Sequence, residues 1–246
     1  MSDERYGTSS PSELTMAPRP FRRLAVLLPT LLLSGASQAR PVVLELFTSQ
    51  GCSSCPPAEA LLGELASDAD LLPLGFHVTY WNHLGWKDTA SSQSATERQA
   101  DYARRLGERS FTPQLVIDGC RSVVGSRRTE VAAAVSQAKA EIGSEVATTL
   151  SRRNDRIDVR LGSGVGSAQV ILLGFDKSVR TPIARGENGG RTILQTNVVR
   201  SMRTLGMWSG KPLEFSEAPP AGQEVAVIVQ RSDGRIVGAA RLTPEL

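Results

Sequence analysis

The sequence is poor in the residues that mark several classes of protein. It has three cysteines, and its 22 glycines and 14 prolines follow no period, so a disulfide-dense scaffold and a collagen-like fibre are excluded. An excess of one charge is also missing, because 28 Lys and Arg residues stand against 25 Asp and Glu residues. The basic residues are dispersed, so we expect no nucleic-acid partner. Apolar residues make up 40% of the 246 positions, which excludes disorder for most of the chain and allows one large domain or two small ones.

A hydrophobic run long enough to cross a membrane is lacking near the N-terminus. The apolar segment 24–33 has about ten residues, half of the ~20 that a spanning helix needs. Arginines precede it, and the small residues Ser37 and Ala39 follow at the spacing of signal-peptidase cleavage. We therefore expect residues 1–39 to be a signal peptide and the mature chain to be periplasmic or secreted, with no stable membrane insertion after the leader is removed. An uncleaved interfacial anchor is the alternative.

Residues 40–143 alternate strand and helix patterns in the order β-α-β-α-β-β-α. A strand, a crossover helix and a second strand should be parallel, and the turn at Asp118-Gly119 should make an antiparallel hairpin. The expected strands are 41–48, 71–81, 114–117 and 121–125, and the expected helices are 58–66, 96–106 and 129–142. The pattern predicts an α/β domain.

Helical periodicity stops near Ser144, and residues 144–246 read as a smaller, mainly β, sandwich-like domain. Alternating apolar and polar residues predict strands, and turn signals such as Asp233-Gly234 separate them. The segment 197–205 is open to a second interpretation as a short helix. The expected strands are 147–150, 157–161, 168–175, 191–199, 224–230 and 235–242.

Two cysteines lie where the first strand meets the first helix, in the pattern Cys52-Ser-Ser-Cys55. A helix N-terminus carries partial positive charge and free N–H groups, which stabilise a thiolate. Cys52 comes first in the exposed loop, so we take it as the nucleophile, with Cys55 as the resolving thiol. Two other interpretations stay open. One is a structural Cys52–Cys55 disulfide, and the other is a copper site made by both thiols and His83, because two thiols alone cannot complete a tetrahedral zinc site.

Two further segments are candidates to support this site. Thr112-Pro113 opens a later strand, and its peptide bond is either cis or an ordinary trans bond at a strand start. The loop after the second strand contains Trp81, His83 and Trp86 and should lie at the same sheet edge as Cys52. In this loop, His83 could assist proton transfer and the two tryptophans could form an apolar side of the site. Alternatively, the loop only packs against the core.

Other polar residues have weaker patterns. Cys120 is expected some 20 Å from Pro113 along the strand, so an inert free thiol is the favoured interpretation, and attachment to a lipid or a disulfide with a partner is the alternative. His77 is expected inside a strand as a core or partly exposed histidine, and Asp88 as a helix or turn cap. The loop 187–191 is expected to be a turn held by Asn188 and a Glu187–Arg191 contact, with a binding role as the alternative.

The strand, the Cys-x-x-Cys helix and the later Thr-Pro strand resemble the thioredoxin superfamily. The segments ELFTSQGCSSCPPAEALLGELA, YWNHLGWKD, FTPQLVIDG and GENGGRT with NVVR more closely resemble a secreted bacterial thioredoxin-like family known as a domain of unknown function. The resemblance covers nearly all of the mature chain. It implies Cys52 as the attacking thiol, Cys55 as the resolving thiol and Pro113, preceded by Thr112, as a cis-proline facing them.

We therefore expect an exported thiol–disulfide oxidoreductase that acts on a protein or small-thiol partner and needs no cofactor. The alternatives are a secreted, non-enzymatic binding module with a structural disulfide and a copper-binding thioredoxin-like protein. The Ser-Ser centre of the motif and Pro56-Pro57 after it depart from ordinary thioredoxins. The long Trp/His loop and the C-terminal region do so too.

Overall fold

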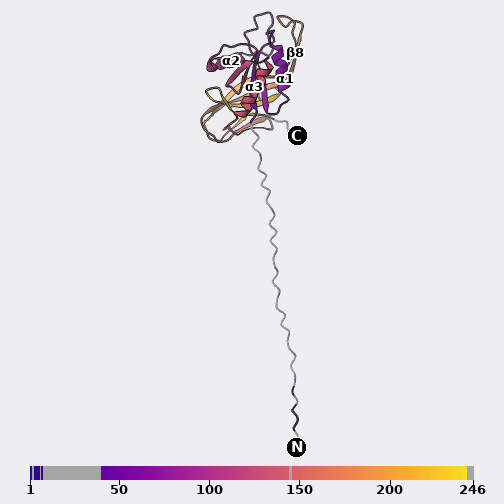
Figure 1. Ribbon diagram of the computed structural model, residues 1–246, viewed down its shortest axis with the longest axis vertical. Coiled ribbons are helices and arrows are strands. Elements are labelled where there is room, and N and C mark those ends of the chain that lie inside the picture. The colour runs from indigo at the N-terminus through magenta and orange to yellow at the C-terminus, as the bar shows by residue number, and fades with distance from the viewer. Residues whose placement is uncertain (2, 6, 8–39, 144–145, 243–246) are drawn as a thin grey trace. The chain divides into compact units, whose positions relative to one another are not determined.

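The computed structural model describes residues 1, 3–5, 7, 40–143 and 146–242 (Figure 1). Its contacts divide the chain into the units Met1–Ser37 and Gln38–Leu246, and all helices and strands named below belong to the second unit. The apolar run and the cleavage site predicted for the leader lie outside the described residues. Within 40–143 and 146–242, no helix has both the length and the apolar character needed to cross a bilayer.

The order of elements predicted for residues 40–143 is confirmed. The second strand ends earlier than predicted, at His77, because the following residues form turns. Ser92 caps the middle helix by accepting a hydrogen bond from the N–H of Ala95, and Gly107 ends it in a left-handed conformation. The elements are β1 (Val42–Thr48), α1 (Pro56–Leu65), β2 (Leu71–His77), α2 (Gln93–Leu106), β3 (Gln114–Ile117), β4 (Arg121–Val124) and α3 (Arg128–Ala140).

The region after residue 145 is made of strands, as predicted, but two of its strands are longer than the sequence pattern indicates. The helix considered for residues 197–205 is wrong, since these residues continue a strand that pairs with its neighbour as far as Trp208. One strand, 213–217, was not predicted. The elements are β5 (Thr148–Arg153), β6 (Arg156–Leu161), β7 (Ala168–Pro182), β8 (Thr192–Trp208), β9 (Leu213–Glu217), β10 (Glu224–Gln230) and β11 (Ile236–Arg241).

Some strands of each region join in one large sheet. Its eight strands lie in the order β11-β10-β7-β8-β2-β1-β3-β4, and a second sheet has the order β5-β6-β9. The parallel β1–β2 pair and the antiparallel β3–β4 hairpin are confirmed. The result is a mixed α/β fold with a large, mostly β sheet and few helices. A separate sandwich-like domain is not confirmed, and a boundary near residue 143 stays a prediction.

The two halves of the large sheet meet where β8 runs beside β2. The pairing is parallel and limited to Gly75 and Val198. Pro73 in β2 has no N–H to donate, and its carbonyl instead accepts a hydrogen bond from the Asn197 side chain at 2.7 Å. A Cβ atom at Gly75 would lie 3.2 Å from the Thr196 carbonyl oxygen, so glycine allows the close approach of the two strands.

Apolar side chains cover both faces of the large sheet. Alternate residues of β1 and β10 point to opposite faces, as the strand geometry requires. On one face, Tyr102 and Ala95 of α2 pack into a cluster that runs across both halves of the sheet. The opposite face is covered by α1 and α3 over β1 and β3, and by the small sheet over β7, β10 and β11.

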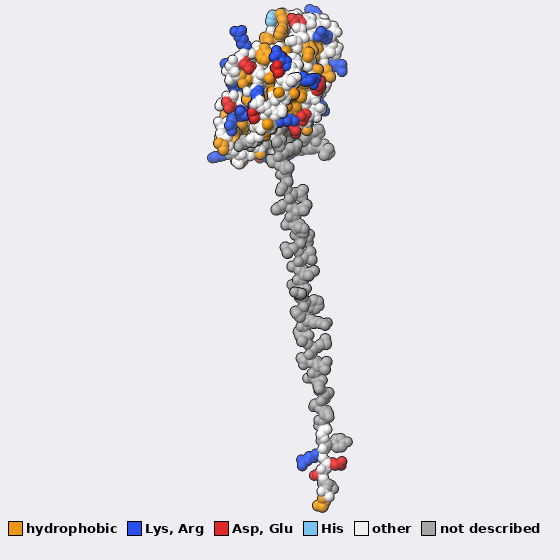
Figure 2. Space-filling model, in the orientation of Figure 1, with side chains coloured by type: hydrophobic (Ala, Val, Ile, Leu, Met, Phe, Trp, Pro, Cys, Tyr) orange, Lys and Arg blue, Asp and Glu red, His pale blue; other side chains and the backbone are white. Residues whose placement is uncertain are grey.

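A buried polar group also joins the two regions. Arg98 of α2 binds both carboxylate oxygens of Glu45 in β1, at 2.5 and 3.0 Å. The same guanidinium donates to Gln230 of β10 at 3.2 Å, and Gln230 donates to the Tyr102 hydroxyl at 2.7 Å. Charged groups are buried in proteins when they are paired and hydrogen-bonded in this way. On the outer surface, the face in Figure 2 shows cationic and anionic side chains intermixed.

Candidate functional site

The turn between β1 and α1 holds a disulfide bond between Cys52 and Cys55, with an S–S distance of 2.12 Å and a Cα–Cα distance of 5.4 Å. Cys55 is the N-cap of α1, so Pro56 occupies the first helical position, where a missing N–H costs nothing. Both cysteines are buried, with exposed fractions of 0% and 1%, while Ser53 and Ser54 between them are exposed. The strand-to-helix position predicted from the sequence is confirmed.

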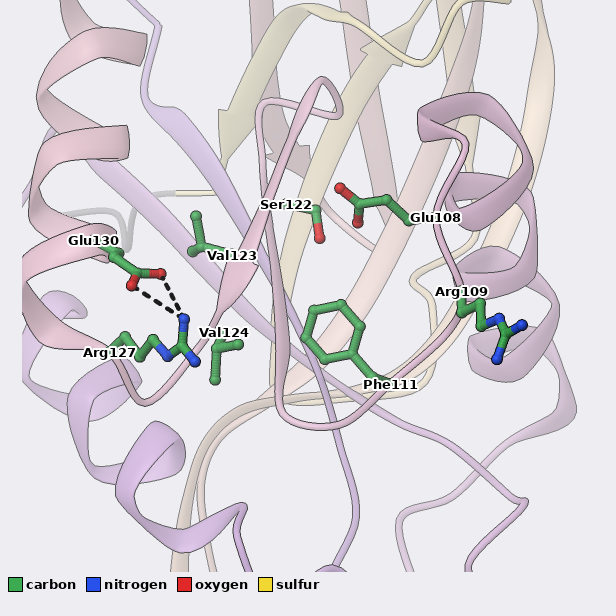
Figure 3. A pocket seen from close by; sticks show the side chains of 8 residues that line it. All are labelled: Glu108, Arg109, Phe111, Ser122, Val123, Val124, Arg127 and Glu130. Carbon is green, nitrogen blue, oxygen red and sulfur yellow. Dashed lines mark hydrogen bonds and ion pairs between the residues drawn. The ribbon is translucent and has the colours of Figure 1, made fainter.

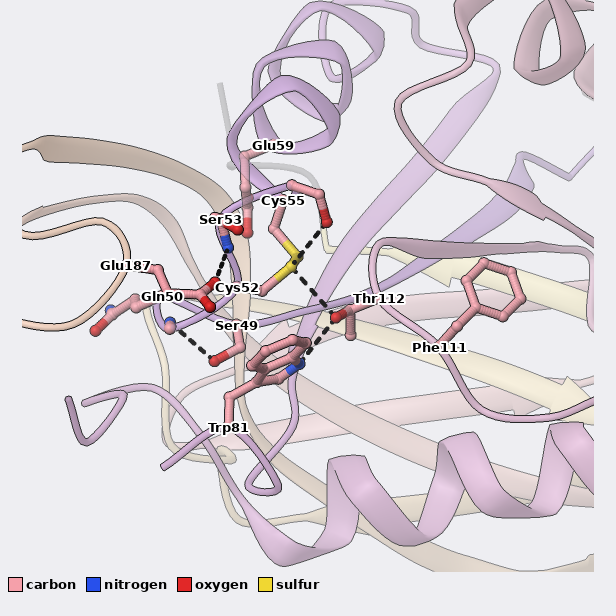
Figure 4. The surroundings of a disulfide bond; sticks show 12 residues. Ser49, Gln50, Cys52, Ser53, Cys55, Glu59, Trp81, Phe111, Thr112 and Glu187 are labelled. Atoms are coloured by element: carbon pink, nitrogen blue, oxygen red, sulfur yellow. Dashed lines mark hydrogen bonds between the residues drawn. A yellow bond between two sulfur atoms is a disulfide. The ribbon is translucent and has the colours of Figure 1, made fainter. Parts of the chain in front are cut away.

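Thr112 lies directly beside the disulfide (Figure 4). Its hydroxyl donates to Cys52 Sγ at 3.3 Å and accepts a hydrogen bond from the indole N–H of Trp81 at 2.9 Å. The peptide bond between Thr112 and Pro113 is cis, one of the two interpretations that the sequence left open. The structure therefore brings Cys52, Trp81, Thr112 and Pro113 together from three separate segments of the chain.

The long loop that follows β2 packs against the cysteine turn through its tryptophans. A Cβ atom at Gly51 would lie 3.2 Å from Trp81 Cβ, so glycine lets the two segments approach. Trp86 donates its indole N–H to the side chain of Gln50 at 3.0 Å. His83, on the same loop, is exposed. In the part of the chain that the structure describes, no three or more His, Cys, Asp and Glu side chains are grouped as a metal site.

A loop from the other half of the sheet also holds the cysteine turn. Asn188 lies between β7 and β8 and is fully buried. Its side-chain amide donates to the carbonyl oxygens of Gln50 at 3.0 Å and of Cys52 at 2.9 Å. Glu187 accepts a hydrogen bond from the Ser53 N–H at 3.3 Å. The expected turn is therefore present, but its Asn and Glu side chains bind the cysteine turn, which lies more than 130 residues away in the sequence.

His77 and Asp88 form a buried pair behind the cysteine turn. His77 Nδ1 lies 2.7 Å from Asp88 Oδ2, and the same carboxylate accepts from the Gln50 N–H at 2.7 Å. Burial alone would lower the pKa of His77, but the hydrogen bond and charge of Asp88 outweigh it and raise that pKa. Burial would raise the pKa of Asp88, but His77 and the backbone N–H donors hold it below its usual value. Asp88 thus caps its loop, as one interpretation expected, and also binds His77.

Cys120 lies away from this site, in the turn between β3 and β4. It is a free thiol of intermediate exposure, and burial raises its pKa. A protonated thiol is a poor nucleophile, so this agrees with the predicted inert cysteine.

A hollow of about 420 Å³ is lined by Phe111, the residue before Thr112, and by residues of β4. Figure 3 shows the ring of Phe111 in its middle, with Arg109 on one side and the Arg127–Glu130 ion pair on the other. Its floor includes residues of β4, which is the outermost strand of the large sheet. An edge strand presents N–H and C=O groups that an extended chain could pair with.

Comparison with known proteins places the chain in a family. Protein AGR_C_4864 from Agrobacterium tumefaciens has a similar crystal structure, with 31% sequence identity and a TM-score of 0.75 over 85% of this chain and 98% of that one. HBP35 of Porphyromonas gingivalis is similar in fold, with 13% identity and a TM-score of 0.56 over 82% of this chain and 74% of that one. A comparison with curated proteins gives no match. Residues 43–230 match the family described as protein of unknown function (DUF1223), and the chain belongs to that family.

Proposed function

We propose that this member of the DUF1223 family is an exported, thioredoxin-like thiol–disulfide oxidoreductase that acts on a protein or small-thiol partner. Cys52 is the attacking thiol and Cys55 is the resolving thiol. One observation carries the proposal: the Cys52–Cys55 disulfide lies at a strand-to-helix turn, where the Thr112 hydroxyl donates to Cys52 Sγ at 3.3 Å.

The reaction is an exchange of disulfides. A partner thiolate attacks Cys52 Sγ, the Cys52–Cys55 bond breaks, and Cys55 leaves as a thiolate that takes up a proton. A second partner thiolate then attacks the partner sulfur of the mixed disulfide, and Cys52 leaves as a thiolate. The two partner thiols lose two electrons and form a disulfide, and the Cys52–Cys55 disulfide is reduced to a dithiol. Each step also runs in reverse, so the same residues serve oxidation or reduction.

The surroundings of Cys52 suit a sulfur that carries negative charge. The turn opens α1, whose N-terminal N–H groups bear partial positive charge. The hydroxyl of Ser54 lies 3.4 Å from Cys52 Sγ. The hydroxyl of Thr112 donates a hydrogen bond to the same sulfur at 3.3 Å. These neutral donors stabilise the thiolate without adding a buried charge.

Access to the sulfur requires a movement, because Cys52 is fully buried in the oxidised protein. Trp81 contacts Gly51 and is held over the turn by its hydrogen bond to Thr112. A partner that takes over the hydrogen bond of Thr112 releases Trp81 and uncovers Cys52. An extended partner could occupy the hollow that Phe111 and the edge strand β4 line, since Phe111 directly precedes Thr112.

Export is the second part of the proposal, and it rests on the leader pattern of residues 1–39. If cleavage follows Ala39, the mature chain begins at Arg40. The Arg40 guanidinium forms a bidentate ion pair with the Asp118 carboxylate, with both N···O distances at 3.0 Å. It also donates a hydrogen bond to the Ile236 carbonyl. The new N-terminus would thus be anchored at its first residue. N-terminal sequencing of the mature protein from a periplasmic fraction tests this, and a start at Met1 would contradict it.

The reduction potential of the Cys52/Cys55 pair tests the redox proposal. The mature protein, with Cys120→Ser to remove the third thiol, is equilibrated with glutathione or dithiothreitol. A potential above about −300 mV supports an exchanging dithiol, and a lower value indicates a structural bond and refutes the proposal. Cys55→Ala in the same background should trap partners as mixed disulfides through Cys52. The matched control, Cys52→Ala with Cys55→Ala, should trap none.

A further inference from the structure

A groove of about 580 Å³ runs between α1 and the start of β8, two elements that pack beside each other (Figure 1). Its residues on α1 recur at helical spacing from Pro56 to Glu64, so this wall is one helix face of roughly 12 Å, at ~1.5 Å per residue. Sites for small molecules enclose about 300–1,000 Å³ and are mostly apolar, with a few polar groups. The groove has the size of such a site, and it shares no lining residue with the hollow that Phe111 lines.

The walls of the groove carry apolar side chains. Ala60 contributes from α1, and Ile193 and Leu194 contribute from β8. Leu194 is 50% exposed, so an apolar ligand in the groove would remove it from water. A Cβ atom at Gly63 would lie 3.1 Å from the hydroxyl oxygen of Thr196, so glycine lets the helix and the strand approach closely there. Gly63 lies about two turns along α1 from the cysteine turn.

A cation lies at the other end of the groove. Arg191, which lines it, donates to the side-chain oxygen of Asn188 at 3.3 Å, and Asn188 binds the Cys52 carbonyl at 2.9 Å. Arg191 therefore stands at the end of the groove that is nearest to the cysteine turn. The side chain is exposed, and a guanidinium has further N–H donors beyond the one that binds Asn188.

The two acidic side chains of the groove add little negative charge to it. Glu64 is bound by both terminal guanidinium nitrogens of Arg128, at 2.6 and 2.8 Å. Glu59 is 4% exposed, and burial raises its pKa, which favours the uncharged carboxyl. Its Oε2 atom has no hydrogen-bond partner within the described residues, and a protonated carboxyl can donate to an anion. The groove can therefore accept a ligand with one negative charge.

The N-terminus of α1 does not supply free N–H groups to such a ligand. The first two helical residues are prolines without an N–H, and the next two N–H groups donate to the Cys55 carbonyl at 2.9 and 3.1 Å. Arg191 is therefore the main donor at this end of the groove. The planar guanidinium matches a carboxylate through two parallel hydrogen bonds. A single cation suits one carboxylate better than the higher charge of a phosphate.

We infer that the groove between α1 and β8 binds a medium-chain aliphatic carboxylate, with its carboxylate on Arg191 and its chain between Ala60 and Leu194. The chain follows the face of α1 toward Gly63 and covers the exposed leucine. A wall of roughly 12 Å favours an extended chain over a single ring. Binding includes no covalent step, and it stands whether or not the disulfide exchanges with a partner.

Isothermal titration calorimetry of the oxidised, mature protein with sodium decanoate tests this inference. We expect saturable binding of one decanoate molecule per chain. Arg191→Gln should weaken the binding about tenfold, because it removes a charge-assisted pair of hydrogen bonds. The matched control is Arg185→Gln, which changes an exposed arginine of the same loop that does not line the groove and should leave the affinity unchanged.

A second pair of variants tests the apolar wall. Leu194→Ser should weaken decanoate binding about fivefold, because the ligand then covers less apolar surface. Met207→Ser is its matched control, since Met207 is an exposed apolar residue of the same strand that lies outside the groove. Decyltrimethylammonium has the same chain with a positive head group, and it should bind more weakly than decanoate because Arg191 repels it.

Three results would overturn the inference. These are the absence of saturable decanoate binding, equal affinities within either matched pair, and decyltrimethylammonium binding as tight as that of decanoate. If a variant does not fold, amide NMR of the unsubstituted, nitrogen-15-labelled protein locates the ligand. Decanoate should shift the signals of Ala60, Gly63 and Leu194, and shifts confined to other residues, such as those around Phe111, would refute the site.

Discussion

The buried side chain of Asn188 connects the second half of the large sheet to the cysteine turn, and we predict that its loss destabilises the folded protein. It donates one hydrogen bond to the Gln50 carbonyl and one to the Cys52 carbonyl, at 3.0 and 2.9 Å, and it is fully buried. Asn188→Ala removes both donors and leaves two buried carbonyl oxygens without these partners. Each lost bond costs about 0.5–1.5 kcal/mol, and the unsatisfied acceptors add to this, so we expect a total loss of about 2–4 kcal/mol.

Asn188→Asp separates hydrogen bonding from packing. The aspartate has nearly the shape of asparagine, but its ionised carboxylate can only accept hydrogen bonds, and it would face two carbonyl oxygens. Arg191, which donates to the Asn188 side-chain oxygen at 3.3 Å, can pair with one carboxylate oxygen and leaves the other against those carbonyls. We therefore expect Asn188→Asp to be at least as destabilising as Asn188→Ala, although it preserves the volume of the side chain.

Urea denaturation of the oxidised protein, followed by tryptophan fluorescence, measures both variants against Arg185→Ala. Arg185 is an exposed residue of the same loop, and its substitution should change the free energy of unfolding by less than about 0.5 kcal/mol. For a domain of this size, the Asn188→Ala loss corresponds to a fall in Tm of about 4–16 °C. If Asn188→Asp is as stable as the unsubstituted protein, the two hydrogen bonds do not hold the turn and the reasoning is wrong.

Three further predictions concern the groups around the disulfide. The buried Glu59 carboxyl has a raised pKa, so the folded protein keeps a proton that the unfolded chain loses above the ordinary value, and stability falls as pH rises through the raised pKa. Glu59→Gln should therefore become more stable relative to the unsubstituted protein as pH rises from 4 to 8 in urea titrations, and a difference that does not grow with pH would contradict this. Trp81→Phe removes the indole hydrogen bond to Thr112, worth ~1 kcal/mol, and should speed reduction of the disulfide by dithiothreitol about fivefold; an unchanged rate would show that Trp81 does not cover the sulfur. Glu187→Gln removes a negative charge beside the Ser53 N–H and should raise the reduction potential by about 10 mV, because the thiolate form of the reduced protein is then favoured; a lower potential would reverse the assigned sign.

The features that depend on short stretches of chain could be predicted from the sequence. The sequence predicted β1, the cysteine turn and α1, because strand and helix periodicities are local. The signals were a β-rich run, the Cys-x-x-Cys motif and apolar residues at helical spacing. The turn at Gly119 predicted the β3–β4 hairpin, because the two strands of a hairpin are joined directly by its turn. The pair Thr112-Pro113 was singled out as a candidate, but the choice between a cis and a trans bond was not local.

The errors of prediction fall where distant contacts override local pattern. Residues 197–205 have an apolar spacing that fits a helix, yet they extend β8 because β7 offers a long partner for hydrogen bonding. The join of β8 to β2 depends on Asn197, Pro73 and Gly75, and none of these residues carries a strand signal. The sequence pattern did not show that strands of the β-rich region join those of residues 40–143 in one sheet, because register between strands more than 100 residues apart has no signature in either strand alone.

The sequence alone therefore determined the two cysteines, their place at the opening of a helix and the order of the elements around them, since spacing and propensity act over a few residues. Only the tertiary structure decided which polar groups surround them. Glu59 reads in the sequence as one acidic residue in the first turn of α1, and Asn188 as a turn residue. Folding removes both side chains from water, and the burial of the Glu59 carboxyl and of the Asn188 amide is not encoded in any local pattern.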